Sequence, residues 1–315
     1  ELLEANVRLP DQVLGDLNAL VAAAMTGRER IKSFIEEYGL EDLKALTTVV
    51  QDKSEAAMRK SIRETPDGIY ENVIQGDGLT DALSFPVQVK IEGDSISVRF
   101  DGSPPQLSRG GSNCTLTYTK AHATYPLKCI FSPEIPGNAG CYKPITVNAP
   151  AGSMLNCDRP ASVNIRTRTG WYIGPNIYLA LADATPHRVQ AFTGLPSSAQ
   201  FYGVEENGRL YSDHLFQGGG QGASAGGDGK SALLYPTSAA NTSVEMFEAR
   251  VPALVLRKEL IVDSGGAGNF RGGLGQVIST RKLKEDGNSC QIGIFPMGIH
   301  SEVEGLFGGQ SGGYS

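Results

Sequence analysis

The chain has 315 residues, of which 40% are hydrophobic and 20% charged, and its formal net charge is −6. This composition excludes an intrinsically disordered chain, and the acidic balance argues against nucleic acid as a partner, because a nucleic-acid-binding surface would be basic. The sequence has no run of about 18 apolar residues, so it predicts no membrane-spanning helix. The five cysteines are odd in number and form no Cys-x-x-Cys pair, which predicts reduced thiols in a cytoplasmic protein.

The first 65 residues have a helical pattern. A helix is predicted to open at Pro10 or Asp11, where proline is tolerated, and to carry an apolar stripe as far as Gly39, a C-terminal cap. Gly27 is expected to break or bend it. A further helix is predicted over residues 41–63. It stops before the turn signal Pro66-Asp-Gly68.

From residue 66 onwards the pattern is mixed. Apolar residues alternate over 87–91 and again over 96–100, around the turn Glu92-Gly-Asp94, which predicts a β-hairpin. Further strands are expected near residues 142–147, 189–192, 201–204, 210–216 and 254–262, and helices over 119–131 and 172–184. The sequence therefore predicts an α+β fold: a helical segment, 1–65, and then a mixed, mostly antiparallel core with long glycine-rich loops, 66–315.

Three glycine clusters stand out in the second half of the chain. They read Gln217-Gly-Gly-Gly-Gln-Gly222, Gly226-Gly-Asp-Gly229 and Asp263-Ser-Gly-Gly-Ala-Gly-Asn-Phe-Arg-Gly-Gly-Leu-Gly275. Each is consistent with tight turns, but glycine also lets backbone N–H groups approach a ligand or another backbone closely. We predict that the clusters meet in space, with Arg271 or Asp228 lining a shared cavity or interface, and that the third loop doubles back to bring Asp263 and Arg271 together.

Titratable residues give weaker signals. The stretch before Lys230 lacks the spacing of a phosphate-binding loop, and none of the four histidines (His122, His187, His214 and His300) has metal-ligand spacing. His214, which follows Asp213 just before the first glycine cluster, is the histidine most expected to face a loop-built cavity. Glu245 and Glu248 lie three residues apart, so they can serve acid–base chemistry or a cation. Equally, Thr242 and Glu245 match a helix-capping pattern, and both interpretations stay open.

Four motifs, in order along nearly the whole chain, resemble the hydantoinase B family. They are Asn6-Val-Arg-Leu-Pro10 with Gly15-Asp-Leu17, then Ile135-Pro-Gly-Asn-Ala-Gly-Cys141 with Lys143-Pro144, then Gly218-Gly-Gly-Gln-Gly222 with Asp228-Gly229, and the third glycine cluster. The resemblance covers the family's later portion. The chain begins at Glu1 and ends on a polar glycine tail, 308–315, so both ends are expected to be cuts through a longer polypeptide.

The resemblance implies a subunit of an ATP-dependent cyclic amide hydrolase of the hydantoinase/5-oxoprolinase type, in a hetero-oligomer with an A-type partner subunit. It places ATP and Mg²⁺ on that partner and a divalent metal in the family's earlier portion, leaving this chain without a cofactor or metal ligand of its own. The substrate would be a small cyclic amide or, in the alternative of a B-like subunit of an acetone or acetophenone carboxylase, a ketone. A scaffold with chemistry elsewhere is a third hypothesis.

The second site of such chemistry should offer positive charge and backbone donors to developing anions. The candidate catalytic residues are Asp228, Arg271, His214 and Glu245. The candidate substrate-binding residues are Gly218, Gly219, Gly220, Asn241 and Asp263.

Overall fold

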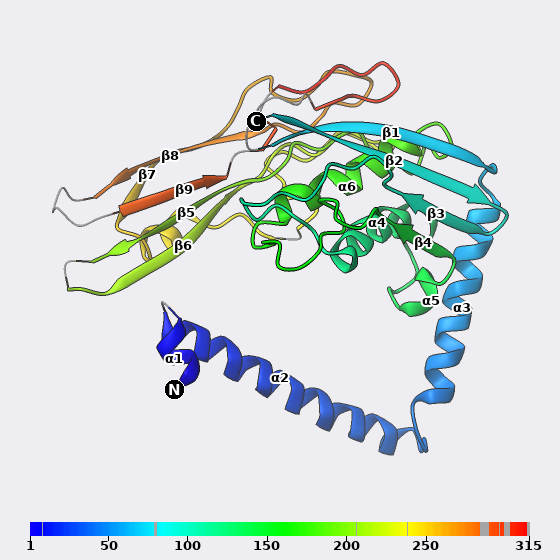
Figure 1. Ribbon diagram of the computed structural model, residues 1–315, viewed down its shortest axis with the longest axis horizontal. Helices are drawn as coiled ribbons and strands as arrows, with labels where there is room; N and C mark the ends of the chain where they lie inside the picture. The colour runs from blue at the N-terminus through cyan, green and yellow to red at the C-terminus, as the bar shows by residue number, and fades with distance from the viewer. Residues whose placement is uncertain are drawn as a thin grey trace.

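The computed structural model describes residues 1–7, 9–78, 81–205, 207–237, 239–283, 290–295, 297–298 and 303–313. His300 lies outside them. The chain folds as the predicted α+β protein, with helices and two sheet regions side by side (Figure 1).

Three helices lead into the body: α1 (Leu2–Asn6), α2 (Pro10–Glu37) and α3 (Lys44–Arg63). In Figure 1, α1 and α2 stand away from the body, and α3 runs back to it at a sharp angle. Of the break or bend predicted at Gly27, the break is wrong, because α2 is continuous through it. One glycine costs a helix only about 1 kcal/mol relative to alanine, and the helix-forming residues around it offset that cost.

Gly39 ends α2 as predicted. Its φ of +62° is in the left-handed region, and the N–H groups of Gly39 and Leu40 donate to the carbonyls of Glu36 and Ile35, which closes a Schellman motif. The next helix begins at Lys44, three residues later than predicted. The Asp42 carboxylate accepts from the Lys44 N–H at 2.7 Å, which delays the first turn.

The larger sheet has the order β1-β2-β3-β4, built from β1 (Gly68–Asp77), β2 (Ala82–Glu92), β3 (Ser95–Arg99) and β4 (Ile145–Asn148). The predicted hairpin is confirmed as β2–β3, with Ile91 opposite Ile96. Strand β4 pairs parallel to β3. Sequence reasoning missed β1, whose exposed face and polar residues weaken the alternation.

Helices α4 (Leu116–Phe131) and α6 (Thr167–Ala180) pack together beside this sheet, and the short α5 (Ala139–Tyr142) precedes β4. Both predicted helices exist, but α6 begins five residues before residue 172 and ends four before 184. Eleven of its fourteen residues are buried, so α6 is a core helix. A helix that is buried on most sides lacks the exposed face whose pattern marks the ends of a surface helix.

The second sheet region holds a three-stranded sheet, order β6-β5-β9, and a two-stranded ribbon, β7-β8. The bounds are β5 (Ser197–Val204), β6 (Leu210–Gln217), β7 (Ala253–Leu260), β8 (Gln276–Lys282) and β9 (Cys290–Phe295), with α7 (Val244–Glu248) between β6 and β7. Phe247 of α7 packs edge-on against Phe201 of β5, with ring centroids 4.9 Å apart. The predicted strand at 189–192 is wrong. That segment forms only the isolated bridge Gln190–Ser224, because its backbone pairs with a glycine loop.

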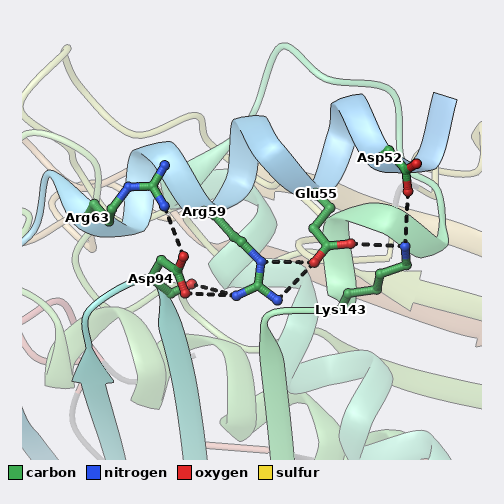
Figure 2. A network of polar contacts seen from close by, with 6 residues as sticks. All are labelled: Asp52, Glu55, Arg59, Arg63, Asp94 and Lys143. Atoms are coloured by element: carbon green, nitrogen blue, oxygen red, sulfur yellow. Dashed lines mark hydrogen bonds and ion pairs between the residues drawn. The ribbon is translucent and has the colours of Figure 1, made fainter. Parts of the chain in front are cut away.

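A chain of charged side chains fastens α3 to the body (Figure 2). Arg59 lies 2.9 Å from Glu55 on its own helix and 2.8 Å from Asp94 in the β2–β3 turn. Lys143, which follows α5, lies 2.9 Å from Glu55 on the other side. The Lys143 ammonium and, next, the Arg59 guanidinium hold the pKa of Glu55 below its ordinary value. The network ties α3 to two segments distant in sequence.

Candidate functional site

The three glycine clusters meet, as predicted. Gln221 in the first cluster exchanges backbone hydrogen bonds with Lys230 and Gly273: its N–H donates to Lys230 at 2.9 Å, and its carbonyl accepts from Gly273 at 2.8 Å. The Gly229 N–H donates to the Arg271 carbonyl at 2.9 Å, which joins the second cluster to the third. Backbone hydrogen bonds therefore join the loops of the three glycine clusters.

Glycine is required where these loops cross. A Cβ placed on Gly220 would lie 1.7 Å from the carbonyl oxygen of Gly273, and one on Gly229 would lie 1.8 Å from that of Gln221. Real Cβ atoms do not approach backbone this closely, so a side chain at either position would force the loops apart. The density of glycine in the sequence is explained by packing of backbone on backbone.

Asp228 organises this junction. Its Oδ1 accepts a hydrogen bond from the Arg271 N–H at 2.7 Å. Both side chains are exposed, and neither lines the cavity described below. The predicted pairing of Asp263 with Arg271 is wrong: among the described residues, no ion pair joins them. Asp263 instead turns the chain, with a φ of +59°.

The segment 303–313 packs against the third cluster. Its backbone donates from Gln310 to the Ala267 carbonyl at 2.8 Å and from Gly313 to the Ser264 carbonyl at 2.9 Å. The polar glycine tail, which sequence reasoning left without a partner, is thus a fourth loop of the same assembly over its described residues.

A cavity of about 550 Å³ lies among these loops, lined by residues within 186–194, 220–225, 264–275 and 303–313. Fourteen of its 32 lining residues are glycine, so backbone rather than side chains forms much of the wall. We call this cavity the glycine cleft. Among its described lining residues, only His187 and Glu304 carry titratable side chains. Its apolar side chains include Phe192, Phe270 and Leu306.

The third glycine cluster, at one side of the glycine cleft, has backbone N–H groups without a hydrogen-bond acceptor among the described residues. Within the described part of the chain, the N–H groups of residues 265–270 donate to no protein acceptor, although the carbonyls of Gly266 and Ala267 accept from Gly272 and Gln310. A run of available N–H groups beside a low-charge cavity can bind a carbonyl oxygen or a developing oxyanion. The cleft is thus suited to a neutral polar molecule.

Among the predicted substrate-binding residues, Gly220 lines the glycine cleft, and Gly218, Gly219, Asn241 and Asp263 do not. Gly218 and Gly219 are buried where the first cluster packs on residues 194 and 232–233. The Asn241 amide donates to the Ala232 carbonyl at 2.8 Å and accepts from Gln276 at 3.2 Å. These groups hold the loops in place.

His214 and Glu245 also lie outside the lining of the glycine cleft. His214 is on β6, with its ring stacked on Phe216 at 5.1 Å, and partial burial lowers the pKa of its imidazole. Glu245 is exposed on α7.

The helix-capping interpretation of this region needs a shift of one residue. The Ser243 hydroxyl, not that of Thr242, accepts from the Met246 N–H and caps α7. Glu248, the other carboxylate of the predicted pair, accepts from the Val255 N–H at 2.7 Å.

His187 is the cleft residue that sequence reasoning passed over. It follows Pro186 in a loop with no motif of its own, so no local signal marks it. Within the described residues, no group of three or more His, Cys, Asp or Glu side chains is arranged to hold a metal ion. In that same part of the chain, no helix is long and apolar enough to cross a membrane.

Comparison with known proteins identifies the family. The family model described as hydantoinase B/oxoprolinase matches residues 1–315. A protein of Pseudomonas sp. (strain NS671), provisionally named as the B-type component of a D-/L-hydantoinase, is 31% identical over 99% of this chain and 55% of its own length. The crystal structure of ATP-dependent caprolactamase from Pseudomonas jessenii aligns with a TM-score of 0.79 at 28% identity, over 89% of this chain and 50% of that one.

A nucleotide-free acetone carboxylase structure shares the fold, with a TM-score of 0.67 at 18% identity, over 79% of this chain and 36% of that one. The chain spans about half the length of the two Pseudomonas relatives. With the family model matching from end to end, the chain belongs to the hydantoinase B/oxoprolinase family.

Proposed function

We propose that this chain forms part of an ATP-dependent cyclic amide hydrolase and that its glycine cleft holds the amide ring. The observation that carries the proposal is the pairing of a nearly uncharged cavity with the free N–H groups of residues 265–270. The amide group of such a ring is neutral and planar and carries a carbonyl oxygen. Such a ring fits a cleft whose polar groups are backbone amides.

The reaction needs an activated amide, because an unactivated amide is a poor electrophile. In a first step, phosphoryl transfer from ATP to the amide oxygen releases ADP and makes the ring carbon electrophilic. In a second step, water adds to that carbon, the ring C–N bond breaks with the nitrogen leaving as an amine, and the acyl phosphate so formed is hydrolysed to the open-chain acid and phosphate. Negative charge develops on oxygen in this second step. Backbone donors held in a fixed arrangement stabilise such charge, and residues 265–270 supply them in our proposal.

We place ATP and Mg²⁺ on an A-type partner subunit, and the complex in the cytoplasm. The existence of a partner subunit is supported by the family relative from Pseudomonas sp. (strain NS671), which is named as one component of a hydantoinase. A divalent metal belongs, in this proposal, to a portion of the enzyme other than this chain. Asp228 and Arg271 act through loop geometry: the carboxylate of Asp228 fixes the backbone of Arg271 and so the shape of the third cluster.

His187 and Glu304 are the titratable groups that we propose for proton transfer at the cleft. Both are exposed and both lie in its lining. The carboxylase alternative has support from the fold alone. The scaffold alternative requires the cleft to be inert, which is testable.

The test is ATP-dependent ring opening by the complete enzyme that contains this chain, with its metal-holding portion and an A-type subunit present, assayed against caprolactam, hydantoin and 5-oxoproline. Ala267→Trp places a large side chain at the cleft from an exposed position, and Ala249→Trp, exposed outside the cleft lining, is the matched control. We expect Ala267→Trp to raise KM for the cyclic amide strongly while Ala249→Trp leaves it unchanged. Equal activity of both variants, with assembly intact, would assign the chain a scaffold role.

A further inference from the structure

Helix α2 has no place in the core of this chain. None of its 28 residues is buried, and its one substantial contact with another described element is with α1 (Figure 1). Large apolar side chains are nevertheless exposed along it, including Leu20 at 69% and Ile31 at 50%. Helices draw most of their stability from packing an apolar face, so an uncovered face of this size marks an interaction surface.

The apolar face has the spacing of a coiled-coil seam. Counting from Leu17 as position a, the a positions are residues 17, 24, 31 and 38, and the d positions are residues 13, 20, 27 and 34. They are occupied in chain order by Val13, Leu17, Leu20, Ala24, Gly27, Ile31, Phe34 and Tyr38. Three to four heptads of this kind indicate that a second helix lies along α2.

The order of side-chain sizes along the seam is palindromic. Large residues occupy both ends, and the two small residues, Ala24 and Gly27, lie together at the centre. When two copies run antiparallel, a positions meet d positions, so Leu20 of one helix faces Ile31 of the other and Ala24 faces Gly27. Every layer then pairs large with large or small with small. A twofold axis between residues 25 and 26 relates the copies, as an isologous interface requires.

From this pattern we propose that the chain forms a homodimer through α2, with two copies of the helix packed antiparallel and crossing most closely at Ala24 and Gly27. The inference goes beyond the proposed function, since it concerns a surface remote from the glycine cleft.

The charges favour the antiparallel orientation. Up to Gly27, the charged residues of α2 are Asp11 and Asp16. After Gly27 the cations and anions balance, three of each: Arg28, Arg30 and Lys32 with Glu29, Glu36 and Glu37. Parallel packing would bring the acidic halves together. Antiparallel packing keeps the two acidic halves apart, each beside a half with no net charge, and it also opposes the two helix dipoles.

The first test is the oligomeric state of the full chain, measured by analytical ultracentrifugation over a wide concentration range. Ala24→Asp puts a charge in the seam, and Ala22→Asp puts the same charge at position f, on the opposite side of the helix. Both alanines are exposed in the single chain, so neither variant should disturb its fold, and circular dichroism checks this. We expect wild type and Ala22→Asp to sediment as two chains, and Ala24→Asp to sediment at the 33.4 kDa of one.

The second test is the orientation of the helices. Under mild oxidation, a mixture of Leu17→Cys and Phe34→Cys chains should form disulfide-linked dimers, and Leu17→Cys alone should form none above the level of wild type, which carries the same five native cysteines. Linkage of Leu17→Cys with itself would overturn the antiparallel arrangement. The homodimer proposal would be overturned if the wild-type chain stayed a monomer at every concentration. It would also be overturned if only a different protein bound along α2.

Discussion

The Arg271 N–H donates a hydrogen bond of 2.7 Å to the Asp228 carboxylate, across 43 residues of sequence. This bond joins the second glycine cluster to the third at the point where their backbones also pair through Gly229. A charged acceptor makes such a bond stronger than one between neutral groups. Asp228 thus contributes to the site by shaping a loop.

Replacing Asp228 should therefore loosen the third cluster. We expect Asp228→Ala to cost about 1 kcal/mol of unfolding free energy, because the bond is exposed, and to speed hydrogen exchange at residues 264–275. Asp228→Asn keeps an oxygen acceptor and should lose less. Urea unfolding and amide exchange by mass spectrometry measure both effects. Unchanged exchange at the third cluster in Asp228→Ala would show that the backbone pairing alone fixes the loop.

Gly220 should tolerate no side chain. Gly220→Ala puts a Cβ 1.7 Å from the Gly273 carbonyl oxygen, so we expect a loss of about 3 kcal/mol or more, or failure to fold. Gly226→Ala is the matched control, because its Cβ meets nothing closer than the Ser224 hydroxyl at 3.6 Å. It should change stability by less than about 0.5 kcal/mol. Similar urea midpoints for the two variants would contradict the close packing of the loops.

The elements that the sequence predicts well are those with strong local signals. The hairpin of β2 and β3 is visible because its buried face alternates cleanly, and Gly39 is visible because a left-handed residue must end α2 there. The ends of core helix α6 are predicted poorly because it is buried on nearly every side. The ribbon strand β8 was missed because its residues are only partly buried and carry no clear alternation.

The glycine cleft could be predicted only in part. Clustered glycines indicate close backbone approach, and the clusters do meet. The residues that complete the cleft are distant in sequence. The backbone of Gly220 packs against Gly273, and His187 lies in a loop that has no recognisable motif. His214, chosen because it precedes a glycine cluster, belongs to a strand whose pleat turns its ring toward Phe216. Proximity in sequence could not distinguish these two histidines.

The two histidines allow a direct test of the site. His187→Gln should lower turnover of the assembled enzyme about 100-fold if the imidazole transfers a proton at the cleft, which is the low end for general acid–base catalysis. His214→Gln should leave turnover unchanged, since His214 lies outside the cleft lining. Steady-state assays at several pH values measure both, and assembly is checked by gel filtration. The reverse result would restore His214 as the catalytic candidate.

The charge network on α3 predicts a specific pH dependence. Lys143 first, and then Arg59, hold the pKa of Glu55 below its ordinary value in the folded chain. A carboxyl group whose pKa is lowered by folding stabilises the fold above its unfolded pKa, about 4.3, and loses that contribution as the pH falls through its folded pKa. Between pH 7 and pH 5 the contribution should be constant, and below about pH 4.3 it should fall away.

Glu55→Gln should remove this part of the acid sensitivity, because an amide cannot titrate. The variant should be less stable than wild type at pH 7, and the difference should shrink as the pH falls, since wild type also loses its Glu55 charge. Glu37→Gln, on the exposed end of α2, is the matched control, and high salt should reduce the Glu55 effect because the pairs lie near solvent. Urea unfolding at a series of pH values gives the curves. The contradicting outcome is a free energy of unfolding whose pH dependence for Glu55→Gln stays parallel to that of wild type down to pH 3. In that case α3 is held to the body by its buried Met58 and Ile62, and the ion pairs add nothing to that attachment.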